Sequence, residues 1–479
     1  MPAATVTTDA HANPISGTQE SIARYDAALD RLLRFHPDVI AQTATLATDE
    51  PEFPMGHVLS AYLCLTSTDS HDLGPARAAA ENLRDLTTND RETAHSIAID
   101  CWLSGDWHGA SQALDSLLQQ WPADLLALMI GHQLDFYLGD AANLRDRVGR
   151  SMLAIEPADP HHGFVRGMHA FGLEESGHYD MSEAAGLRAL EVNPDDVWAL
   201  HAVVHSYEMR GMVDDGIRFM RRRQADWADA NFFTVHNWWH LCLYLLEAGH
   251  TRDALAIYDE RIHHAGSDCV PLELLDASAL LWRLMLDGED TGDRFAALAS
   301  AWEAHVGDAP WYAFNDLHAV MAFCGAGRLD DATAVVERLS AYVDAAPARS
   351  ASNVAMTAEI GLPACRAALA FAEGRDDDVI AELVPIRAVL SHFGGSHAQR
   401  DALQRTVVEA ALRSGQSNLA RALLSERISL RDTSVYAWQR QSRLLRSSGD
   451  ATGALAADAT ATALQARFAQ AASEPAAGI

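Results

Sequence analysis

Apolar residues recur along the chain at the three- and four-residue spacing of one helix face. A representative set is Leu241, Tyr244, Leu245 and Ala248. Short β-branched runs bounded by turn residues, which would indicate strands, are missing from the sequence. The pattern therefore predicts an all-α fold.

Short turns repeat along the chain, each with a glycine that follows an apolar helix and precedes a more polar one. These glycines are Gly105, Gly139, Gly177, Gly211, Gly249, Gly288, Gly327, Gly374, Gly415 and Gly449. Their successive spacings are 34, 38, 34, 38, 39, 39, 47, 41 and 34 residues. This is close to the period of tetratricopeptide repeats, with short insertions.

Hairpins of this kind bury their apolar faces only against neighbouring hairpins. The sequence therefore predicts a right-handed superhelix of tetratricopeptide-like helical hairpins, with a concave inner groove lined by the first helix of each pair. The predicted array is a single domain of residues 21–465, with its clearest repeats in 96–345. Residues 1–20 are expected to form a flexible arm, and residues 466–479 a loose tail.

Composition narrows the range of partners. The 479 residues include 36 basic and 66 acidic side chains, and the formal net charge of -30 repels nucleic acid and anionic membranes. No lysine occurs, which excludes Schiff-base chemistry. The six cysteines are widely spaced, and neither a signal peptide nor an apolar run of membrane-spanning length is recognisable. We expect a cytoplasmic protein without nucleic-acid or membrane partners.

Two pairs of histidines stand out on the first helices of adjacent central hairpins. His201 and His205 are four residues apart in WALHAVVHSYEMRG, and Glu208 follows three residues later on the same face. His236 and His240 repeat the four-residue spacing in HNWWHLCLYLLEAG. Because neighbouring helix axes are about 8–10 Å apart, the two pairs are expected to meet in one pocket.

Further polar and aromatic residues occur at matching levels of these first helices. Counted back from the turn glycines, the matching residues are His240 and His318 at minus nine, and Asp276, Asn237 and Asn315 at minus twelve. Trp239 and Trp282 are among the aromatic residues around them. A few convergent polar groups within aromatic walls are typical of a small-molecule site.

The chain resembles the tetratricopeptide repeat protein 38 family from Ala170 to Phe323, most closely in AFGLEESGHY, HAVVHSYEMRG, HNWWHLCLYLLEAG, SALLWRL and FNDLHAVMAF. The resemblance implies a soluble helical-repeat protein. The characteristic positions that it marks are His201, His205, Glu208, His236, Asn237, Trp239, His240, Asp276, Asn315 and His318. It implies no particular activity.

Three functions remain open for this pocket. In the first, it binds a small polar ligand and transforms it by acid/base chemistry, with His205–Glu208 and His240–Asp276 as candidate catalytic pairs. The ligand-binding residues would then be His201, His236, Asn237, Trp239, Trp282, Asn315 and His318. In the second, the groove of a scaffold grips a peptide or partner protein. In the third, the histidines bind zinc or iron in a metal-dependent enzyme.

Residue types favour the first of these functions. Peptide-carboxylate clamps usually rely on basic side chains, whereas residues 200–209 offer histidines. The zinc-binding motif H-E-x-x-H is missing from the sequence. We therefore expect a small polar ligand in the concave groove, with no cofactor and no tightly bound metal, and a protein partner as the alternative.

Overall fold

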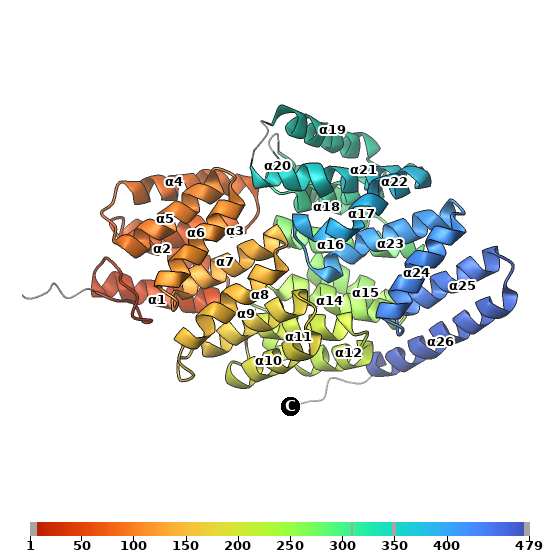
Figure 1. Cartoon of the computed structure of the whole chain (residues 1–479), viewed down its shortest axis with the longest axis horizontal. Helices are drawn as coiled ribbons and strands as arrows, with labels where there is room; N and C mark the ends of the chain where they lie inside the picture. Colours follow the sequence, from red (N-terminus) through yellow and green to blue (C-terminus); the bar gives the residue numbers. More distant parts are fainter. Residues whose placement is uncertain (1–6, 308–309, 347–350, 474–479) are drawn as a thin grey trace, which may run out of the picture.

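The computed structural model describes residues 7–307, 310–346 and 351–473. Within these residues the chain is helical from α1 (Gln19–Leu33) to α26 (Ala451–Ser473), and β pairing is confined to an isolated bridge between Thr8 and Pro14. Figure 1 shows successive helices packed side by side along a curved array. The all-α prediction is confirmed.

The helices of the first half are α2 (Asp38–Asp49), α3 (Pro54–Thr66), α4 (Leu73–Arg84), α5 (Asp90–Leu103), α6 (Trp107–Gln120), α7 (Leu125–Leu138), α8 (Ala141–Ser151), α9 (His162–Glu175), α10 (Tyr179–Val192), α11 (Val197–Met209), α12 (Val213–Arg222) and α13 (Gln224–Trp227). Those of the second half are α14 (Thr234–Glu247), α15 (Thr251–Ile257), α16 (Pro271–Asp287), α17 (Arg294–Glu303), α18 (Ala313–Gly325), α19 (Leu329–Ala345), α20 (Ser352–Met356), α21 (Leu362–Ala372), α22 (Asp376–Ile386), α23 (His397–Arg413), α24 (Ser417–Leu430) and α25 (Val435–Ser447). Short 3₁₀ or π segments are η1 (Ser70–Asp72), η2 (Met152–Ala154), η3 (Tyr258–Ile262), η4 (Thr357–Gly361) and η5 (Arg387–Phe393).

Glycines end the first helices of the hairpins, as the repeat pattern predicts. All ten turn glycines have φ between +67° and +87°, a left-handed conformation that costs a glycine nothing because it has no Cβ. At Gly139, for example, the backbone N–H donates to Phe136 O (3.0 Å) and closes the end of α7. The chain is therefore a superhelix of tetratricopeptide-like hairpins.

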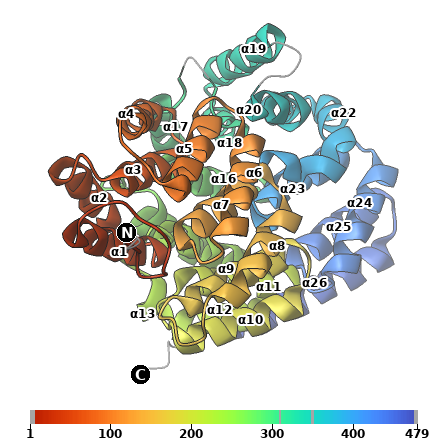
Figure 2. The same cartoon turned by 60° about the vertical axis from the view of Figure 1, so that its left-hand side comes forward.

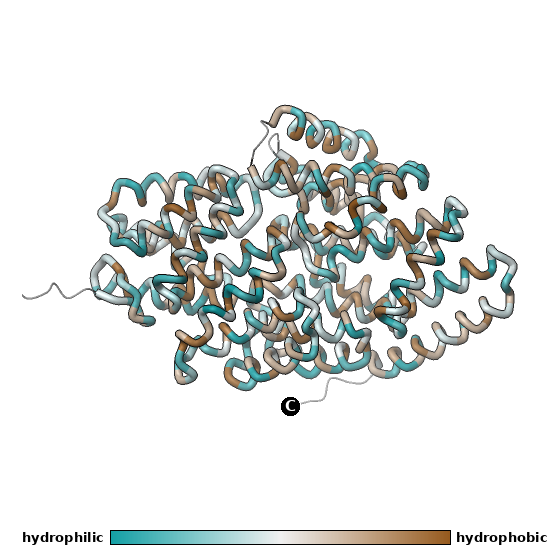
Figure 3. The backbone as a smooth tube through the Cα atoms, viewed as in Figure 1, coloured by the Kyte–Doolittle hydropathy of each residue, from teal (hydrophilic) through white to brown (hydrophobic). Residues whose placement is uncertain are grey.

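Neighbouring hairpins pack closely in the first half of the array. A Cβ placed on Gly172 of α9 would lie 2.5 Å from Arg145 Cα and 2.7 Å from Leu144 O of α8. Hydrophobic and hydrophilic residues alternate along each helix in Figure 3, as expected where one face packs and the other meets solvent or a polar neighbour. The backbones of α8 and α9 can therefore approach this closely only with glycine at position 172.

The array curls until its second half packs against its first half. Trp107 of α6 contacts Trp311 and Tyr312, with ring centroids 5.3 and 5.5 Å away. Ser352 N donates to Gly105 O across the same junction (2.8 Å). Farther along, α23 contacts both α11 and α16, and Figure 1 shows it beside α16. Figure 2 shows helices of the second half behind and beside those of the first half. The chain's own α23 thus occupies the predicted concave groove at this level.

Parts of both chain ends are packed, in contrast to the expected flexible arm and loose tail. Asp9 and Arg91 form a buried ion pair of 3.0 Å, so the segment predicted as an arm, 1–20, contributes to the core from residue 7 onward. In the predicted tail, 466–479, α26 continues to Ser473 and Phe468 is fully buried. Residues 1–6 and 474–479 lie outside the described residues. The partners of these segments are distant in sequence, so composition alone did not reveal them.

One helical stretch of the described residues, Ser352–Ala372, is long and apolar enough to cross a membrane by length and composition. Glu359 and Arg366 interrupt it, so the sequence shows no uninterrupted apolar run of that length there. The fold buries 67% of its most apolar window. This burial is typical of a core helix, and the stretch comprises α20, η4 and α21, which pack against α18 and α19.

We expect Gly172→Ala to lower the free energy of unfolding by about 1–3 kcal/mol, because the added methyl forces α8 and α9 apart. The matched control is Gly149→Ala in α8, where the nearest atom to the new Cβ would be His169 Nε2 at 3.8 Å. This exposed glycine lies inside a helix, so alanine should leave stability unchanged or raise it by up to about 1 kcal/mol. Urea denaturation measures both changes. Equal stabilities of Gly172→Ala and wild type would contradict the packing described.

Candidate functional site

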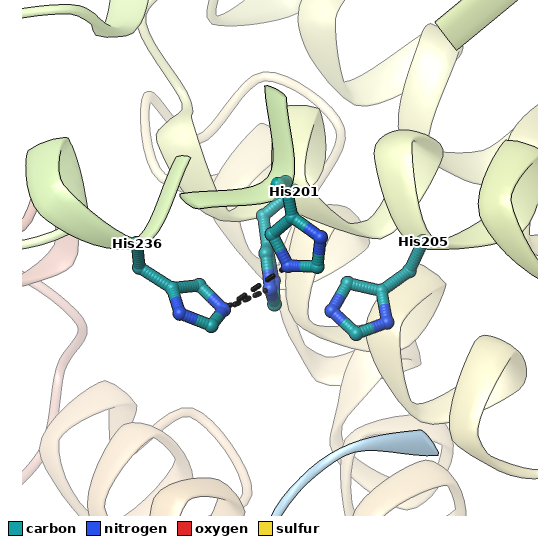
Figure 4. Close-up of side chains that lie close together, drawn as sticks. His201, His205 and His236 are labelled. Atoms are coloured by element: carbon teal, nitrogen blue, oxygen red, sulfur yellow. Dashed lines mark hydrogen bonds between the residues drawn. The ribbon is translucent and has the colours of Figure 1, made fainter. Parts of the chain in front are cut away.

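Four histidines from two adjacent helices meet in the interior of the array. His201 and His205 lie on α11, and His236 and His240 lie on α14. We call these four residues the histidine centre. One nitrogen of each ring lies within 4.8 Å of those of the others, and His236 Nε2 is 3.0 Å from His201 Nε2 and 3.2 Å from His240 Nε2. Figure 4 shows His201, His205 and His236 converging on one region.

Two carboxylates hold the outer nitrogens of the α14 histidines. His236 Nδ1 donates to Asp276 Oδ2 of α16 (2.7 Å), and His240 Nδ1 donates to Glu208 Oε2 of α11 (3.2 Å). This pairing differs from the predicted pairs, His205–Glu208 and His240–Asp276. Glu208 reaches across to α14 and pairs with His240 instead of His205. Asp276 of α16 lies level with His236 and pairs with that ring instead of His240.

Aromatic rings line the histidine centre. The Trp198 ring lies 5.3 Å from the His201 ring, and Trp239 stacks on His236 at 5.4 Å. Phe35, from the loop after α1, stacks in turn on Trp198 at 5.3 Å. Trp239 therefore lies where the sequence predicted a site residue, whereas Phe35 comes from a hairpin that the sequence analysis did not connect with the site.

Burial favours the neutral form of three of these imidazoles, His201, His205 and His240. Desolvation, reinforced by the neighbouring imidazoles, lowers the pKa of His201 and of His240 well below 6.5. Desolvation also lowers the pKa of His205 to about 4, and it raises the pKa of Glu208 above its ordinary value. A neutral imidazole has a free lone pair, so at neutral pH the centre can accept a proton or coordinate a cation.

Two adjacent acids at the end of α9, Glu174 and Glu175, lie beside His205. Glu174 Oε2 is 3.6 Å from His205 Nδ1, and both side chains are fully buried. Glu175 accepts hydrogen bonds from His397 N (3.1 Å) and Arg400 Nη2 (3.3 Å) of α23. Desolvation and the charge of Glu175 raise the pKa of Glu174 well above its ordinary value. Desolvation also acts to raise the pKa of Glu175, but the charges of His397 and Arg400 outweigh it, so the pKa of Glu175 is lowered.

The sequence analysis missed Glu174 and Gln399 for different reasons. Glu174 and Glu208 both lie three residues before a turn glycine, so the repeat register contained a signal for Glu174. Gln399 Nε2 donates to Asp276 Oδ1 (3.2 Å) from 123 residues farther along the chain. No local pattern connects positions so far apart, and only the curling of the array brings them together.

Four predicted ligand-binding residues lie outside the histidine centre: Asn237, Trp282, Asn315 and His318. Trp282 Nε1 donates to Thr406 Oγ1 (2.9 Å), and Asn315 Nδ2 donates to Thr68 O (3.1 Å). His318 Nδ1 donates to Phe314 O of its own helix (2.7 Å). Residues at the same distance in sequence from their turn glycines therefore do not share one site. Each first helix is displaced from the one before it along the array, so their side chains contact different neighbours.

Asn237 is excluded from the centre by helix geometry. It follows His236 by one position, and consecutive residues on a helix point about 100° apart. Its side chain is fully buried, and neither its Nδ2 nor its Oδ1 has a hydrogen-bond partner in the described part of the chain.

A small cavity of about 30 Å³ borders the centre on the side of Glu208. Its lining includes Tyr244, Arg283, Arg405 and Thr433. Arg283 lies over the Trp239 ring (5.3 Å to the centroid), so this cavity adjoins the aromatic wall as well. The space admits about one water-sized molecule.

Comparison with solved structures finds distant helical-repeat proteins. The human IFIT1 dimer with PPP-AAAA is 12% identical over 96% of this chain and 96% of that chain, with a TM-score of 0.39. A monomeric IFIT1 mutant with Gppp-AAAA is 11% identical over 94% and 96%, with a TM-score of 0.38. The TPR domain of P58(IPK) is 10% identical over 80% and 97%, with a TM-score of 0.21. No family model matches the chain, so its fold assignment rests on its own helices and turns.

His132 of α7 fixes Trp198, one of the aromatic walls. His132 Nδ1 donates to Leu144 O (3.1 Å), and Trp198 Nε1 donates to His132 Nε2 (3.1 Å). Desolvation lowers the pKa of this fully buried ring to about 3. A proton on Nε2 would place two N–H donors face to face, so the folded chain requires the neutral ring.

His132 should contribute to the pH dependence of stability. Its pKa is lower in the folded chain than the roughly 6.5 of an unfolded chain, so its stabilising effect is present above that pH and is lost as the pH falls below it. The loss is about 1.4 kcal/mol per pH unit for one such group. Urea denaturation from about pH 7.5 to about pH 5 should show a smaller loss of unfolding free energy in His132→Asn than in wild type. The difference in slope against pH should correspond to about one proton fewer taken up on unfolding.

The control for this experiment is His108→Asn, because His108 is exposed on α6. It should keep the wild-type dependence on pH. An unchanged dependence in His132→Asn would show that His132 does not stay neutral in the folded chain.

Proposed function

We propose that this helical-repeat protein binds a small polar ligand at the histidine centre and has acid/base groups in place to transform it. The observation that carries the proposal is the convergence of four imidazoles within 4.8 Å at the inner helices. Membership of the tetratricopeptide repeat protein 38 family and a cytoplasmic location belong to the same proposal. They rest on the sequence motifs and on the six unpaired cysteines.

Occupation of the groove by α23 favours a small ligand over a peptide. His397 N donates to Glu175, and Gln399 donates to Asp276 (3.1 and 3.2 Å). Arg283 of α16 donates to Ala398 O of α23. A peptide that reached the histidine centre along the groove would have to displace these buried contacts, whereas a molecule of a few atoms would not.

The two carboxylate–imidazole pairs are suited to moving a proton. Asp276 accepts a hydrogen bond from His236 Nδ1, and Glu208 accepts one from His240 Nδ1. The Nε2 lone pairs of both rings therefore face the centre. An imidazole oriented in this way by a carboxylate acts as a general base. In this proposal His240, Glu208 and Asp276 form the proton-handling set, together with His205, which lies 3.6 Å from Glu174.

An open cleft elsewhere on the surface favours a protein or peptide partner as the second candidate function. The cleft has a volume of about 570 Å³ and lies between the first hairpin and the start of α11. Charges of both signs line it, including Asp30, Arg34, Asp195 and Asp229. Such a surface suits a partner of mixed charge, and it contains none of the residues that the sequence singled out.

Native mass spectrometry of the full chain tests the first candidate. We expect a non-covalent adduct on the native protein that disappears on denaturation. The adduct should be lost in His201→Ala/His240→Ala and kept in His108→Ala, which removes an exposed histidine. Thermal-shift measurements with metal ions and small polar molecules provide the second readout. At a ligand concentration about 100 times Kd, binding adds about 2.7 kcal/mol of stability, which the double variant should not gain.

A wild-type chain with no adduct and no response to any of these compounds would contradict a small-ligand site. It would leave the partner-binding candidate as the better explanation.

A further inference from the structure

Among the described residues, four groups of side chains could each offer three or more ligands to a metal ion, and the histidine centre differs from the other three. The other groups are His11, Asp159 and His161; Asp69, His71 and His305; and Glu174, Glu175 and His205. Each of these three groups contains a carboxylate that forms an ion pair with a histidine or an arginine, for example Asp69 with His305 at 2.9 Å. That carboxylate is therefore less available as a metal ligand. The histidine centre alone consists entirely of imidazoles.

We propose that the histidine centre binds one divalent first-row transition-metal ion, zinc or iron(II), through His201, His205, His236 and His240. This inference rests on the proposed function, because it keeps the histidine centre as the ligand site and names the ligand. It replaces the expectation of no tightly bound metal. The carboxylates then orient the metal-binding rings instead of relaying protons.

The nitrogen spacing suits a metal. Zinc bound to imidazole at about 2.0–2.1 Å in a tetrahedron holds its ligand nitrogens about 3.3–3.4 Å apart. His236 Nε2 lies 3.0 Å from His201 Nε2 and 3.2 Å from His240 Nε2. The two separations that involve His236 Nε2 are therefore close to those that a shared metal ion imposes.

His205 can supply the fourth ligand. One of its nitrogens lies within 4.8 Å of the other three. Its side chain is fully buried, yet neither ring nitrogen has a hydrogen-bond partner in the segments that the structure describes. Burying an imidazole in this way is costly unless something binds it. Glu174 Oε2 lies 3.6 Å from His205 Nδ1, too far for a hydrogen bond, so both ring nitrogens remain available to a metal ion.

The hydrogen bonds of the α14 histidines leave two lone pairs facing each other. Asp276 and Glu208 each accept a hydrogen bond from the Nδ1–H of one ring. The Nε2 atoms of His236 and His240, 3.2 Å apart, then both carry lone pairs and repel each other. A cation between them removes the repulsion.

The surroundings also match the second layer of a metal site. Ligand histidines usually donate their other N–H to a carboxylate, which fixes the ring and strengthens it as a ligand. Asp276 does this for His236 and is itself fixed by Gln399 (3.2 Å). Neutral imidazoles select zinc, iron or copper over magnesium and calcium, which prefer oxygen ligands.

Elemental analysis of the full chain, purified without added metal, is the first measurement. We expect about one equivalent of zinc or iron per wild-type chain and under about a tenth of an equivalent in His201→Ala/His240→Ala. After chelation, Co²⁺ titration of the apo protein should saturate at about one equivalent and give the visible absorption of tetrahedral Co(II).

Asp276→Asn is the second variant, because asparagine keeps an acceptor oxygen for His236 but removes the charge. It should weaken Co²⁺ binding by about 10–100-fold. His108→Ala, at an exposed position, should bind Co²⁺ like wild type. Circular dichroism checks that each variant keeps its helices. If the double variant unfolds, the wild-type spectrum and the affinity of Asp276→Asn decide the question.

Two results would overturn the metal site. The first is a wild-type chain that contains no metal and whose apo form gives no saturable Co²⁺ signal. An organic adduct in the native mass spectrum would then still support the proposed function. The second is a full equivalent of metal retained by a folded double variant, which would place the ion elsewhere on the chain as an adventitious ion.

Discussion

The burial of four imidazoles at one point of the core constrains the residues packed around them. A buried imidazole loses solvation in its charged form, so burial favours the neutral ring, whose polar atoms depend on partners that the protein supplies. The hydrogen-bond partners of the α14 rings come from two different helices, with Glu208 on α11 and Asp276 on α16. These helices therefore have to keep a fixed spacing. The turn glycines make this possible, because they allow turns tight enough for the two helices of each hairpin to pack closely.

Closure of the superhelix depends on arginine as much as on apolar packing. Asp401 of α23 accepts from Arg405 of the same helix (2.8 Å) and from Arg427 of α24 (2.7 Å), while Arg405 also donates to Glu247 of α14 (3.1 Å). A guanidinium group is planar and carries several fixed donors, so one arginine can join two acids while largely buried. In a chain without lysine, this network links the C-terminal helices to the central hairpins.

The histidine centre and the protein surface differ in character. The formal net charge of -30 is a property of the whole chain, and it is set mainly by exposed acids. The centre itself is built from imidazole rings packed against tryptophan and phenylalanine, where electrostatic interactions are stronger than in water. An array that encloses such a centre with its own α23 is suited to holding an ion or small molecule in a fixed environment. An open tetratricopeptide-like groove would instead offer its inner helices to a macromolecule.

The sequence by itself determined the helical hairpins, the positions of their turns and the two histidine pairs. These features are local: helical periodicity, left-handed glycines and four-residue spacing on one face all operate within a few turns of chain. Only the tertiary structure decided which acid serves which histidine, that α23 fills the groove, and that Asn315 and Trp282 bond elsewhere. These outcomes depend on how far each hairpin rotates relative to the previous one. Small rotations add up over many repeats, so they fix contacts such as Gln399 with Asp276, 123 residues apart, that no local pattern encodes.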